Sequence, residues 1–404
     1  MKKTLIAMGV LGAFSSLAFA ASNVTLYGVI EEGVMVSKAK HKDTTVQMKS
    51  GFDQGPRWGI KGVEDLGNGY NVGFILEQGF SADTGAEGTA GKAFNRESFM
   101  YVNGGFGKLG VGRTGALSSG AQSNQILTGW ALGTGYMMSA WNSMTTGTLR
   151  MDNAVAYNTP SFDGFSLHAM YSNGIVEDTA KWSENNHYYG IGAKYQANAI
   201  RSSLIFEAID NKGAAADVYP ASSANKRVFL INYGLEYNLG SWTPMFAYQW
   251  FNQDEGKKTH QFGLSAKVGV AGGDVLVGGR YLFGHDESVT TGTDKVRAWN
   301  VGAAYVYPLS KRTAIKAYAG YADSSKAWAD KPDTSYNGYA VILGLRHSFK
   351  SLSDKDLIRP SPRFLGGGFV SGRKYEKQNF SCFCPCNFWI FRFCRFQCNT
   401  LRKH

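Results

Sequence analysis

Charged side chains stand before and after one long segment that carries no charge. The segment, Thr114–Leu149, is rich in Gly, Ser, Thr, Met and Trp and has no Asp, Glu, Lys or Arg. The charged residues around it are Arg57, Lys61, Glu77, Arg96, Arg113, Arg150 and Asp152. Fixed charges act on ions within about one Debye length, roughly 10 Å at 0.1 M salt. The chemistry that these residues suggest is electrostatic selection of ions.

Nucleophilic catalysis is the alternative chemistry, and it needs a nucleophile, a base and an orienting acid placed together. The seven histidines are scattered along the chain. His168 and His347 fall within predicted strands, and neither recurs with a serine and an acid at a matching depth. We therefore expect no enzyme and no cofactor, and a barrel hydrolase is the less favoured alternative.

Alternating apolar residues predict the elements that must position the charged groups. In Tyr339–Phe349 the odd positions are almost all large and apolar, and the even positions are small or polar except Ile342. Period two indicates a strand with one face in an apolar medium and the other in water. Strands of roughly ten residues cross a bilayer at a tilt. Only a closed sheet satisfies every backbone group in lipid, so the fold class predicted is an all-β transmembrane antiparallel barrel.

About sixteen strands are predicted between Asn23 and Phe349. They are Asn23–Val36, Arg57–Glu64, Tyr70–Phe80, Phe94–Asn103, Lys108–Arg113, Met151–Asn158, Phe165–Ser172, Asn186–Gln196, Ile200–Asp210, Arg227–Leu239, Trp242–Gln253, Thr259–Val270, Asp274–His285, Lys295–Tyr307, Thr313–Asp323 and Tyr336–Phe349. Tight turns such as Asp65–Gly69 alternate with longer polar loops such as Ser37–Pro56. Short turns at one end and long loops at the other are typical of bacterial outer-membrane barrels. A soluble sandwich is the alternative, but it does not need so many long strands.

Strand parity predicts which charged residues face the inside of the barrel. We expect the apolar side chains of Trp58 and Ile60 to face lipid. Since alternate residues of a strand lie on opposite faces, Arg57 and Lys61 are expected to face inward. The same reasoning turns Glu77 inward, and it turns Arg96 inward because its parity is opposite to that of Phe99 and Tyr101. It also turns Arg150 and Asp152 inward, opposite to Val155 and Tyr157. Arg113 shares the parity of Leu109 and Val111, so only a bulge at the strand end would turn it inward.

The uncharged segment Thr114–Leu149 is expected to fold into the barrel. Long loops without structure of their own are usually functional or disordered. A loop of this length without a charge is better suited to packing on the inner wall than to water. An exposed loop is the alternative.

Met1–Ala20 has the anatomy of a signal peptide. Lys2 and Lys3 precede an apolar stretch, Leu5–Leu17, and Ala18-Phe19-Ala20 is a small-x-small cleavage site. We expect the mature chain to begin near Ala21 and to be exported. A buried N-terminal helix is the alternative.

The C-terminal part, Lys350–His404, differs from the rest of the chain. It holds all five cysteines, lacks period two, and carries 11 of the basic residues and 3 of the acidic ones. The net charge of +11 therefore comes mostly from this part, and it gives no reason to expect nucleic-acid binding by residues 21–349. We interpret 350–404 as a non-barrel extension, disordered or translated past a lost stop. A metal site at Cys382, Cys384 and Cys386, or a disulfide cluster, is the alternative.

Four ordered motifs resemble the general porins of Gram-negative bacteria. They are Val24–Ile30, Arg57–Gly67, Gly104–Arg113 and Asp152–Gly164. The resemblance covers Ala21–Phe349. It implies a trimer whose third loop, here Thr114–Leu149, narrows the pore opposite a ladder of basic side chains that includes Arg57, Arg113 and Arg150. The loop in that family usually carries acidic residues, whereas this one carries none.

The resemblance also implies a location and partners. It implies a bacterial outer-membrane location, contacts with membrane lipid and lipopolysaccharide, and an assembly machinery that reads a terminal aromatic residue, here Phe349. The expected function is a diffusion pore for small hydrophilic solutes and ions, with a preference for anions. A substrate-specific channel is the alternative, and it would show an aromatic track along the lumen.

Overall fold

The computed structural model describes residues 24–40, 42–119, 123–132, 150–175, 181–212, 225–325 and 338–351. The predicted signal peptide lies outside these residues. So does the predicted extension, apart from its first two residues. The predicted domain boundaries therefore remain predictions.

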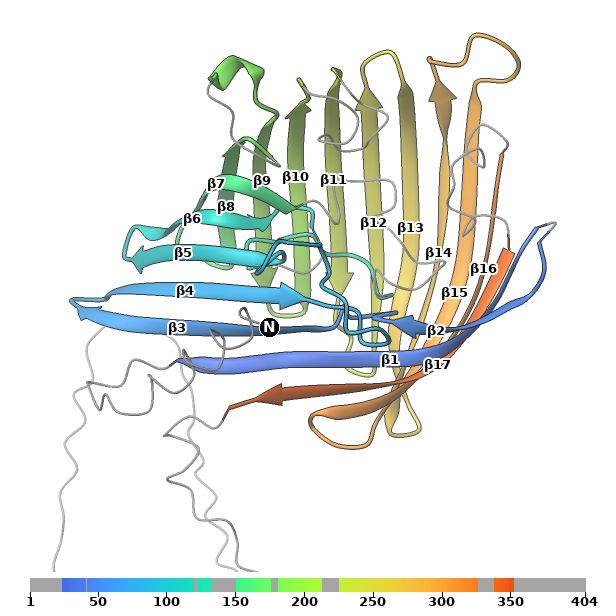
Figure 1. Ribbon diagram of the computed structural model, residues 1–404, viewed down its shortest axis with the longest axis horizontal. Helices are drawn as coiled ribbons and strands as arrows, with labels where there is room; N and C mark the ends of the chain where they lie inside the picture. Colours follow the sequence, from blue (N-terminus) through green and yellow to red (C-terminus); the bar gives the residue numbers. More distant parts are fainter. Residues whose placement is uncertain are drawn as a thin grey trace, which may run out of the picture. The chain divides into compact units, whose positions relative to one another are not determined.

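In this described part of the chain, seventeen antiparallel strands form a single sheet, whose arrangement is drawn in Figure 1. They are β1 (Thr25–Ala39), β2 (Thr45–Ser50), β3 (Arg57–Gly67), β4 (Tyr70–Gly79), β5 (Glu97–Gly104), β6 (Gly107–Gly115), β7 (Arg150–Asn158), β8 (Phe165–Asn173), β9 (His187–Ala197), β10 (Ile200–Asp210), β11 (Arg227–Tyr237), β12 (Trp242–Gln253), β13 (Lys257–Val270), β14 (Gly273–Asp286), β15 (Lys295–Pro308), β16 (Thr313–Ser324) and β17 (Gly338–Lys350). A 3-10 turn, η2, spans Trp182–Glu184. Among the described residues, no helix is both long and apolar enough to cross a membrane.

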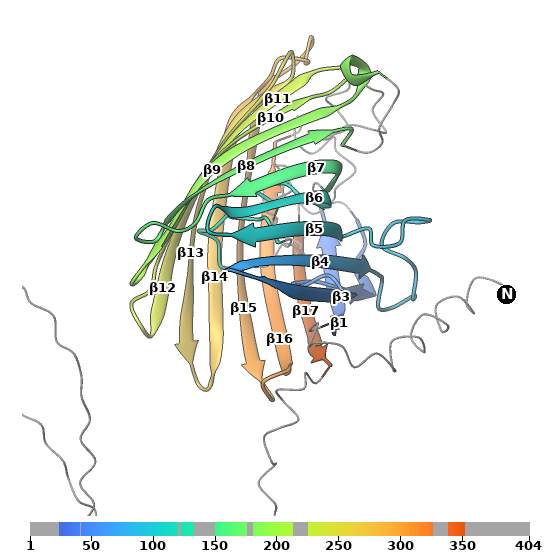
Figure 2. The same cartoon turned by 90° about the vertical axis from the view of Figure 1, so that its left-hand side faces the viewer.

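The sheet closes on itself through β1. This strand pairs with β17 along one edge and with β3 along the other, and each strand from β3 to β17 pairs with the next in the chain (Figure 2). β2 also pairs with β1, beyond the end of β3. Of the seventeen strands, β2 alone is extra to the ring, so the barrel has sixteen strands as predicted. The prediction missed β2, which lies within the expected loop Ser37–Pro56.

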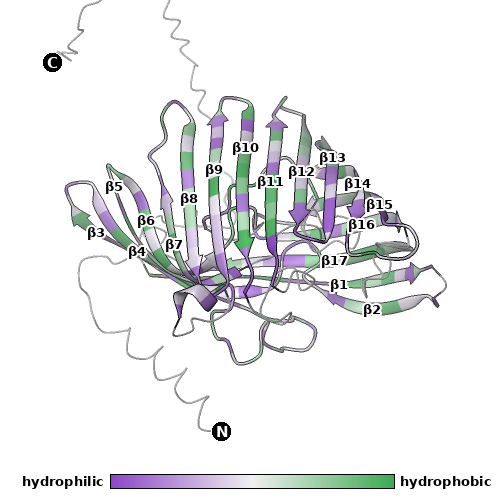
Figure 3. Cartoon of the chain, turned by 90° about the horizontal axis from the view of Figure 1, so that it is seen from above, coloured by the Kyte–Doolittle hydropathy of each residue, from purple (hydrophilic) through white to green (hydrophobic). Residues whose placement is uncertain are grey.

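Hydrophobic and hydrophilic residues alternate along the strands (Figure 3), and large apolar side chains take the exposed outer positions. Leu264 and Leu343 are 68% and 61% exposed, whereas Asn232 and Lys316 are fully buried. This distribution of exposed apolar and buried polar side chains is the reverse of that in a soluble protein. It is the pattern required when lipid surrounds the barrel and polar groups line its lumen.

Tight turns close one end of the barrel. Between β3 and β4, Gly67, Asn68 and Gly69 all have positive φ, of 82°, 53° and 80°. Residues without a Cβ, and asparagine, tolerate this backbone, so the sequence selects the hairpin. The longer connections lie at the other end, as the alternation of loop lengths predicted.

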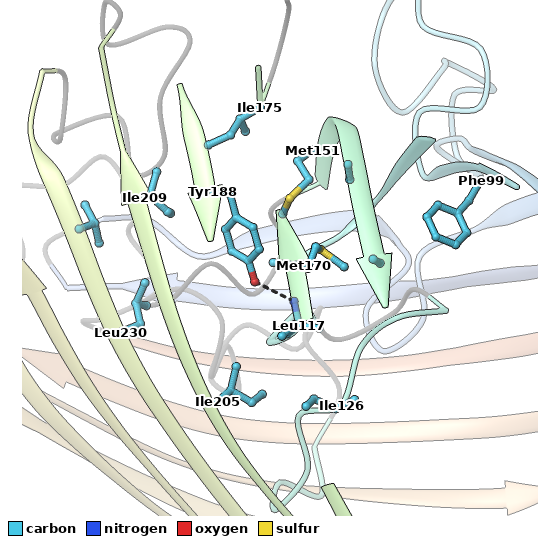
Figure 4. Packing of buried hydrophobic residues seen from close by; sticks show 14 of the residues in the cluster. Phe99, Leu117, Ile126, Met151, Met170, Ile175, Tyr188, Ile205, Ile209 and Leu230 are labelled. Atoms are coloured by element: carbon cyan, nitrogen blue, oxygen red, sulfur yellow. Dashed lines mark hydrogen bonds between the residues drawn. The ribbon is translucent and has the colours of Figure 1, made fainter. Parts of the chain in front are cut away.

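The described part of the third loop folds into the barrel, which confirms the prediction for these residues. Of Thr114–Leu149, residues 114–119 and 123–132 are described. Leu117 and Ile126 pack inside the barrel against Tyr188, Ile205 and Ile209 of the wall (Figure 4). The Leu117 backbone N–H also donates to the Tyr188 hydroxyl at 3.1 Å. The loop therefore lies against the inner wall and is held by apolar and polar contacts together.

Candidate functional site: a charged inner wall

Three of the predicted residues meet on the inner wall beside the third loop. Glu77 of β4 accepts a hydrogen bond from Arg96 Nε at 2.7 Å, and Arg57 Nε lies 3.3 Å from its other oxygen. The Tyr27 hydroxyl also donates to Glu77, at 3.0 Å. We call Arg57, Glu77 and Arg96 the inner group. One carboxylate is shared by two guanidinium groups, so the inner group carries a net positive charge.

Two further predicted inward residues are Arg150 of β7 and Lys61 of β3. Arg150 begins β7, and the charges of Arg96 and Arg113 both act on it. Lys61 lies four residues from Arg57 along β3, about 13 Å at the strand rise. Its ammonium is exposed and stands 5.1 Å from the centre of the Tyr27 ring. Lys61 therefore faces the lumen at a different level.

Arg113 and Asp152 form a second group, on the other face of the wall. Arg113 Nη1 lies 2.6 Å from Asp152, which is also 2.6 Å from Lys92 Nζ. We call Lys92, Arg113 and Asp152 the outer group. They line a depression of about 1000 Å³ together with Val111 and Val155. These valines belong to the exposed apolar row, at 46% and 44% exposure.

The prediction that a bulge turns Arg113 inward is wrong. The register between β6 and β7 does shift between Gly112 and Thr114. The extra residue belongs to β7, where Asn153 has a φ of 52°. It leaves Thr114 buried and inward, so the adjacent Arg113 points outward. The same bulge breaks the parity that assigned Arg150 and Asp152 to the inside, because Met151 between them takes the buried position.

The parity assigned to Arg96 was also wrong, although this side chain does reach Glu77. Phe99 is 2% exposed and faces inward, whereas Met100 and Val102 are 56% and 38% exposed. The prediction had treated Phe99 as lipid-facing. Arg96 precedes β5, so strand parity does not govern it. Its position follows from the contact with Glu77.

Acidic side chains of the wall hold the uncharged loop. Glu97 accepts from the Thr114 hydroxyl at 3.0 Å and from the Ser123 backbone N–H at 3.2 Å. Further along the wall, Glu207 accepts from the Ser118 N–H at 3.2 Å. Carboxylates bind backbone N–H groups with charge-assisted hydrogen bonds. The loop needs no charge of its own because the wall supplies the anchors.

The same arrangement continues along the wall. Glu236 accepts from the Gly129 N–H at 3.2 Å and from the Thr128 hydroxyl. The Ala131 N–H donates to the Ser265 hydroxyl at 3.1 Å. Sequence reasoning missed these anchors, although strand parity alone turns Glu207 and Glu236 inward. Parity shows that these carboxylates face inward, but it does not show whether they face solutes or hold the loop.

A polar row on the inner wall resembles part of a catalytic triad without an acid. Ser166 Oγ lies 3.0 Å from His168 Nε2, and His168 Nδ1 lies 2.9 Å from the amide oxygen of Asn158. No group of three or more His, Cys, Asp or Glu in the described part of the chain is arranged to hold a metal ion.

The predicted assembly signal, Phe349, lies at the end of β17 with its ring against Gly28.

Comparison with known proteins agrees with this architecture. The sequence profile described as Gram-negative porin matches residues 7–327. An outer membrane porin protein of Bordetella pertussis is 28% identical over 401 residues, covering 86% of this chain and 100% of that protein. Outer membrane porin protein 32 of Delftia acidovorans is 27% identical, with the same coverage.

Solved porin structures share the fold. An anion-selective porin from Comamonas acidovorans superposes with a TM-score of 0.62 at 23% identity, covering 81% of this chain and 100% of that one. The trimer form of OmpT from Vibrio cholerae gives a TM-score of 0.58 at 14% identity, covering 82% and 100%. The chain is an outer-membrane diffusion pore rather than an enzyme, and it belongs to the Gram-negative porin family.

Proposed function

We propose that this pore carries small hydrophilic solutes with a preference for anions. The observation that carries the proposal is the make-up of the inner group, in which two guanidinium groups share one carboxylate and Arg57 is the most exposed member. The side chain of Glu77 is 8% exposed and that of Arg57 is 19% exposed. Glu31 and Glu97 are buried at 0% and 3%, whereas Lys61 is exposed. At the inner group, a solute in the lumen therefore meets the Arg57 guanidinium more readily than the Glu77 carboxylate.

The mechanism is partition into a water-filled passage screened by size and by fixed charge. Arg57 and Arg96 attract an anion toward the level of the third loop, and Lys61 continues the field along β3. Low-dielectric walls focus such a field. The solved porin named anion-selective has the same fold, which is consistent with the proposal.

The reversal potential of the protein in a planar bilayer under a salt gradient tests this proposal. We expect the sign that corresponds to anion preference at low salt. Substituting Arg57→Gln should move the reversal potential toward cations. Arg227→Gln is the matched control, since Arg227 pairs with Asp254 at the rim with 63% of its side chain exposed. Cation preference of the unmodified pore would refute the assignment of the inner group.

We further propose that the outer group lies in the interface of a homotrimer. Lys92, Arg113 and Asp152 share the outer face with apolar side chains, and charged groups facing lipid are costly. Contact with a second copy would cover them. The trimer form solved for the OmpT relative is consistent with this assembly. Mass measurement in detergent tests it, and a monomeric wild-type protein would refute it.

A substrate-specific channel is the second candidate, favoured by lysine–aromatic pairs inside the barrel. Lys108 Nζ lies 4.6 Å from the centre of the Tyr101 ring, and Lys61 lies over Tyr27 in the same way. Such pairs would hold anionic solutes with planar groups. Flux that saturates with solute concentration would favour this candidate, and linear flux favours general diffusion.

For the domain organisation, we propose that the barrel needs no residue after Phe349. The extension Lys350–His404 would mask the terminal aromatic residue that the assembly machinery reads. Truncation after Phe349 should raise the amount of protein in the outer membrane. If truncation instead abolished insertion into the outer membrane, the extension would be required for assembly of the barrel.

A further inference from the structure

A six-residue stretch between β2 and β3 leaves the sheet and enters the barrel. Ser50 pairs with Glu32 of β1, and Arg57 pairs with Val29. Only two residues of β1 therefore stand opposite residues 51–56. We call residues 51–56 the inner segment. Phe52 of this segment is fully buried, and its ring lies 3.0 Å from where a Cβ on Gly33 would be.

A network of buried charges holds the inner segment in place. Lys316 Nζ of β16 lies 2.5 Å from Glu31 Oε2 and also contacts the Asp53 carboxylate. The other oxygen of Glu31 accepts from the backbone N–H groups of Asp53 and Gln54, at 2.6 and 2.7 Å. Lys316 and Glu31 are 0% exposed. Burying charges is costly unless each is paired and hydrogen-bonded, as these are.

The end of the inner segment contacts the inner group. Arg57 Nη1 donates to the Gly55 carbonyl at 2.9 Å. A Cβ on Gly55 would lie 3.3 Å from Arg96 Nη1, so any larger residue would press on that guanidinium. Both arginines that share Glu77 therefore rest on this segment.

The beginning of the inner segment contacts the third loop through an apolar cluster. Phe52 belongs to a buried cluster with Leu132 of the loop, and Trp130 packs against it. Tyr318 and Ile342, on inward positions of β16 and β17, complete this contact. The inner segment and the third loop thus reinforce each other inside one lumen.

We propose that the inner segment is a second element of the constriction and that Glu31, Asp53 and Lys316 are positioning residues for ion selectivity. They do not face the solute. They fix the segment on which Arg57 and Arg96 rest. The inference rests on the proposed anion preference, because it explains how the guanidinium groups are held.

The sign of a selectivity change separates positioning from direct electrostatics. The network holds two acids and one base, a net charge of −1. Neutralising it in the variant Glu31→Gln, Asp53→Asn, Lys316→Met removes this negative charge. A purely electrostatic effect would therefore increase anion preference. Loss of positioning would instead release Arg57 and Arg96 and reduce that preference.

The experiment is the reversal potential and single-channel conductance of this variant in a planar bilayer under a salt gradient. We expect a reversal potential closer to zero than that of the wild type, and a higher conductance as the segment loosens. The control is Arg227→Gln with Asp254→Asn, which removes an exposed pair at the rim and should change neither value. An unchanged or increased anion preference would overturn the proposal.

A second variant keeps the test valid if the triple variant does not fold. Gly55→Ala leaves the charge network intact and places a methyl group against Arg96. It should shift the reversal potential in the same direction with little change in conductance. A Gly55→Ala pore with wild-type selectivity would also contradict the proposal. Absence of anion preference in the wild type would refute the proposed function itself, which is a separate outcome.

Discussion

The inner and outer groups contain the same chemistry on opposite faces of one stretch of wall. In each, two basic side chains share one carboxylate: Arg57 and Arg96 share Glu77, and Arg113 and Lys92 share Asp152. The inner group borders the lumen and rests on Gly55. The outer group lies among exposed valines. The difference teaches that residue type and pairing do not determine the role of a charge in a barrel. The face on which it lies determines that role.

The largest expected effect comes from breaking the outer group. Asp152→Ala leaves Arg113 and Lys92 without their carboxylate on the apolar face, where an uncompensated basic residue costs about 2–4 kcal/mol at mid-membrane depth. The assembly should dissociate at a lower temperature, as followed by semi-native electrophoresis. The reversal potential should not change. A selectivity shift without loss of thermal stability would place this group in the lumen after all.

Opposite substitutions within the inner group should shift selectivity in opposite directions. Arg57→Gln removes a partly exposed positive charge, so anion preference should fall. Glu77→Gln leaves both arginines without the carboxylate that they share, so anion preference should rise. Reversal potentials measured in the same salt gradient check both signs. Two shifts of the same sign would mean that altered packing, and not charge, dominates.

Weakening an anchor of the third loop should change conductance more than selectivity. Glu236→Gln converts charge-assisted bonds to Thr128 and Gly129 into neutral ones, a loss of about 1 kcal/mol or more. Single-channel recordings should show larger current fluctuations. Lys258→Gln, at the rim where Lys258 pairs with Glu287, is the control and should leave the current unchanged. Steady current in Glu236→Gln would show that the apolar contacts alone hold the loop.

The smallest effect is the dependence on salt. Raising ionic strength from 0.1 M to 1 M shortens the Debye length from about 10 Å to about 3 Å. Anion preference should decline over this range without structural change. The decline is measured as the reversal potential at a fixed concentration ratio. A preference independent of salt would indicate selection by size or by direct binding.

The strands and the inward loop were predictable because each has a local cause. Apolar side chains recur at every second residue because one face of the sheet lies against lipid. This alternation identified every strand of the ring. The loop was predictable from its lack of charge. The strand β2 was missed because Phe52 and Asp53 interrupt the alternation between β2 and β3. Asp53 is held by Lys316, which is far away in the sequence.

The charged site was less predictable, for reasons that concern single residues. Strand parity assigns Arg57 and Glu77 to the same face, and the two side chains are in contact, since no irregularity separates them from neighbouring apolar residues. It was wrong for Asp152, because Asn153 adds a residue to β7 and reverses the alternation. Nothing in the local sequence marks that bulge. A one-residue shift moves a side chain to the other face, so one bulge changed the predicted role of a whole group.

The most direct test of the account compares Arg57→Gln with Arg113→Gln in the same planar bilayer under the same salt gradient. Each substitution removes one positive charge from an arginine–carboxylate contact, so the two variants differ in the face that is altered. The account predicts that Arg57→Gln shifts the reversal potential toward cations and that Arg113→Gln leaves it at the wild-type value. Equal shifts, or a shift only in Arg113→Gln, would contradict the assignment of the two groups to opposite faces.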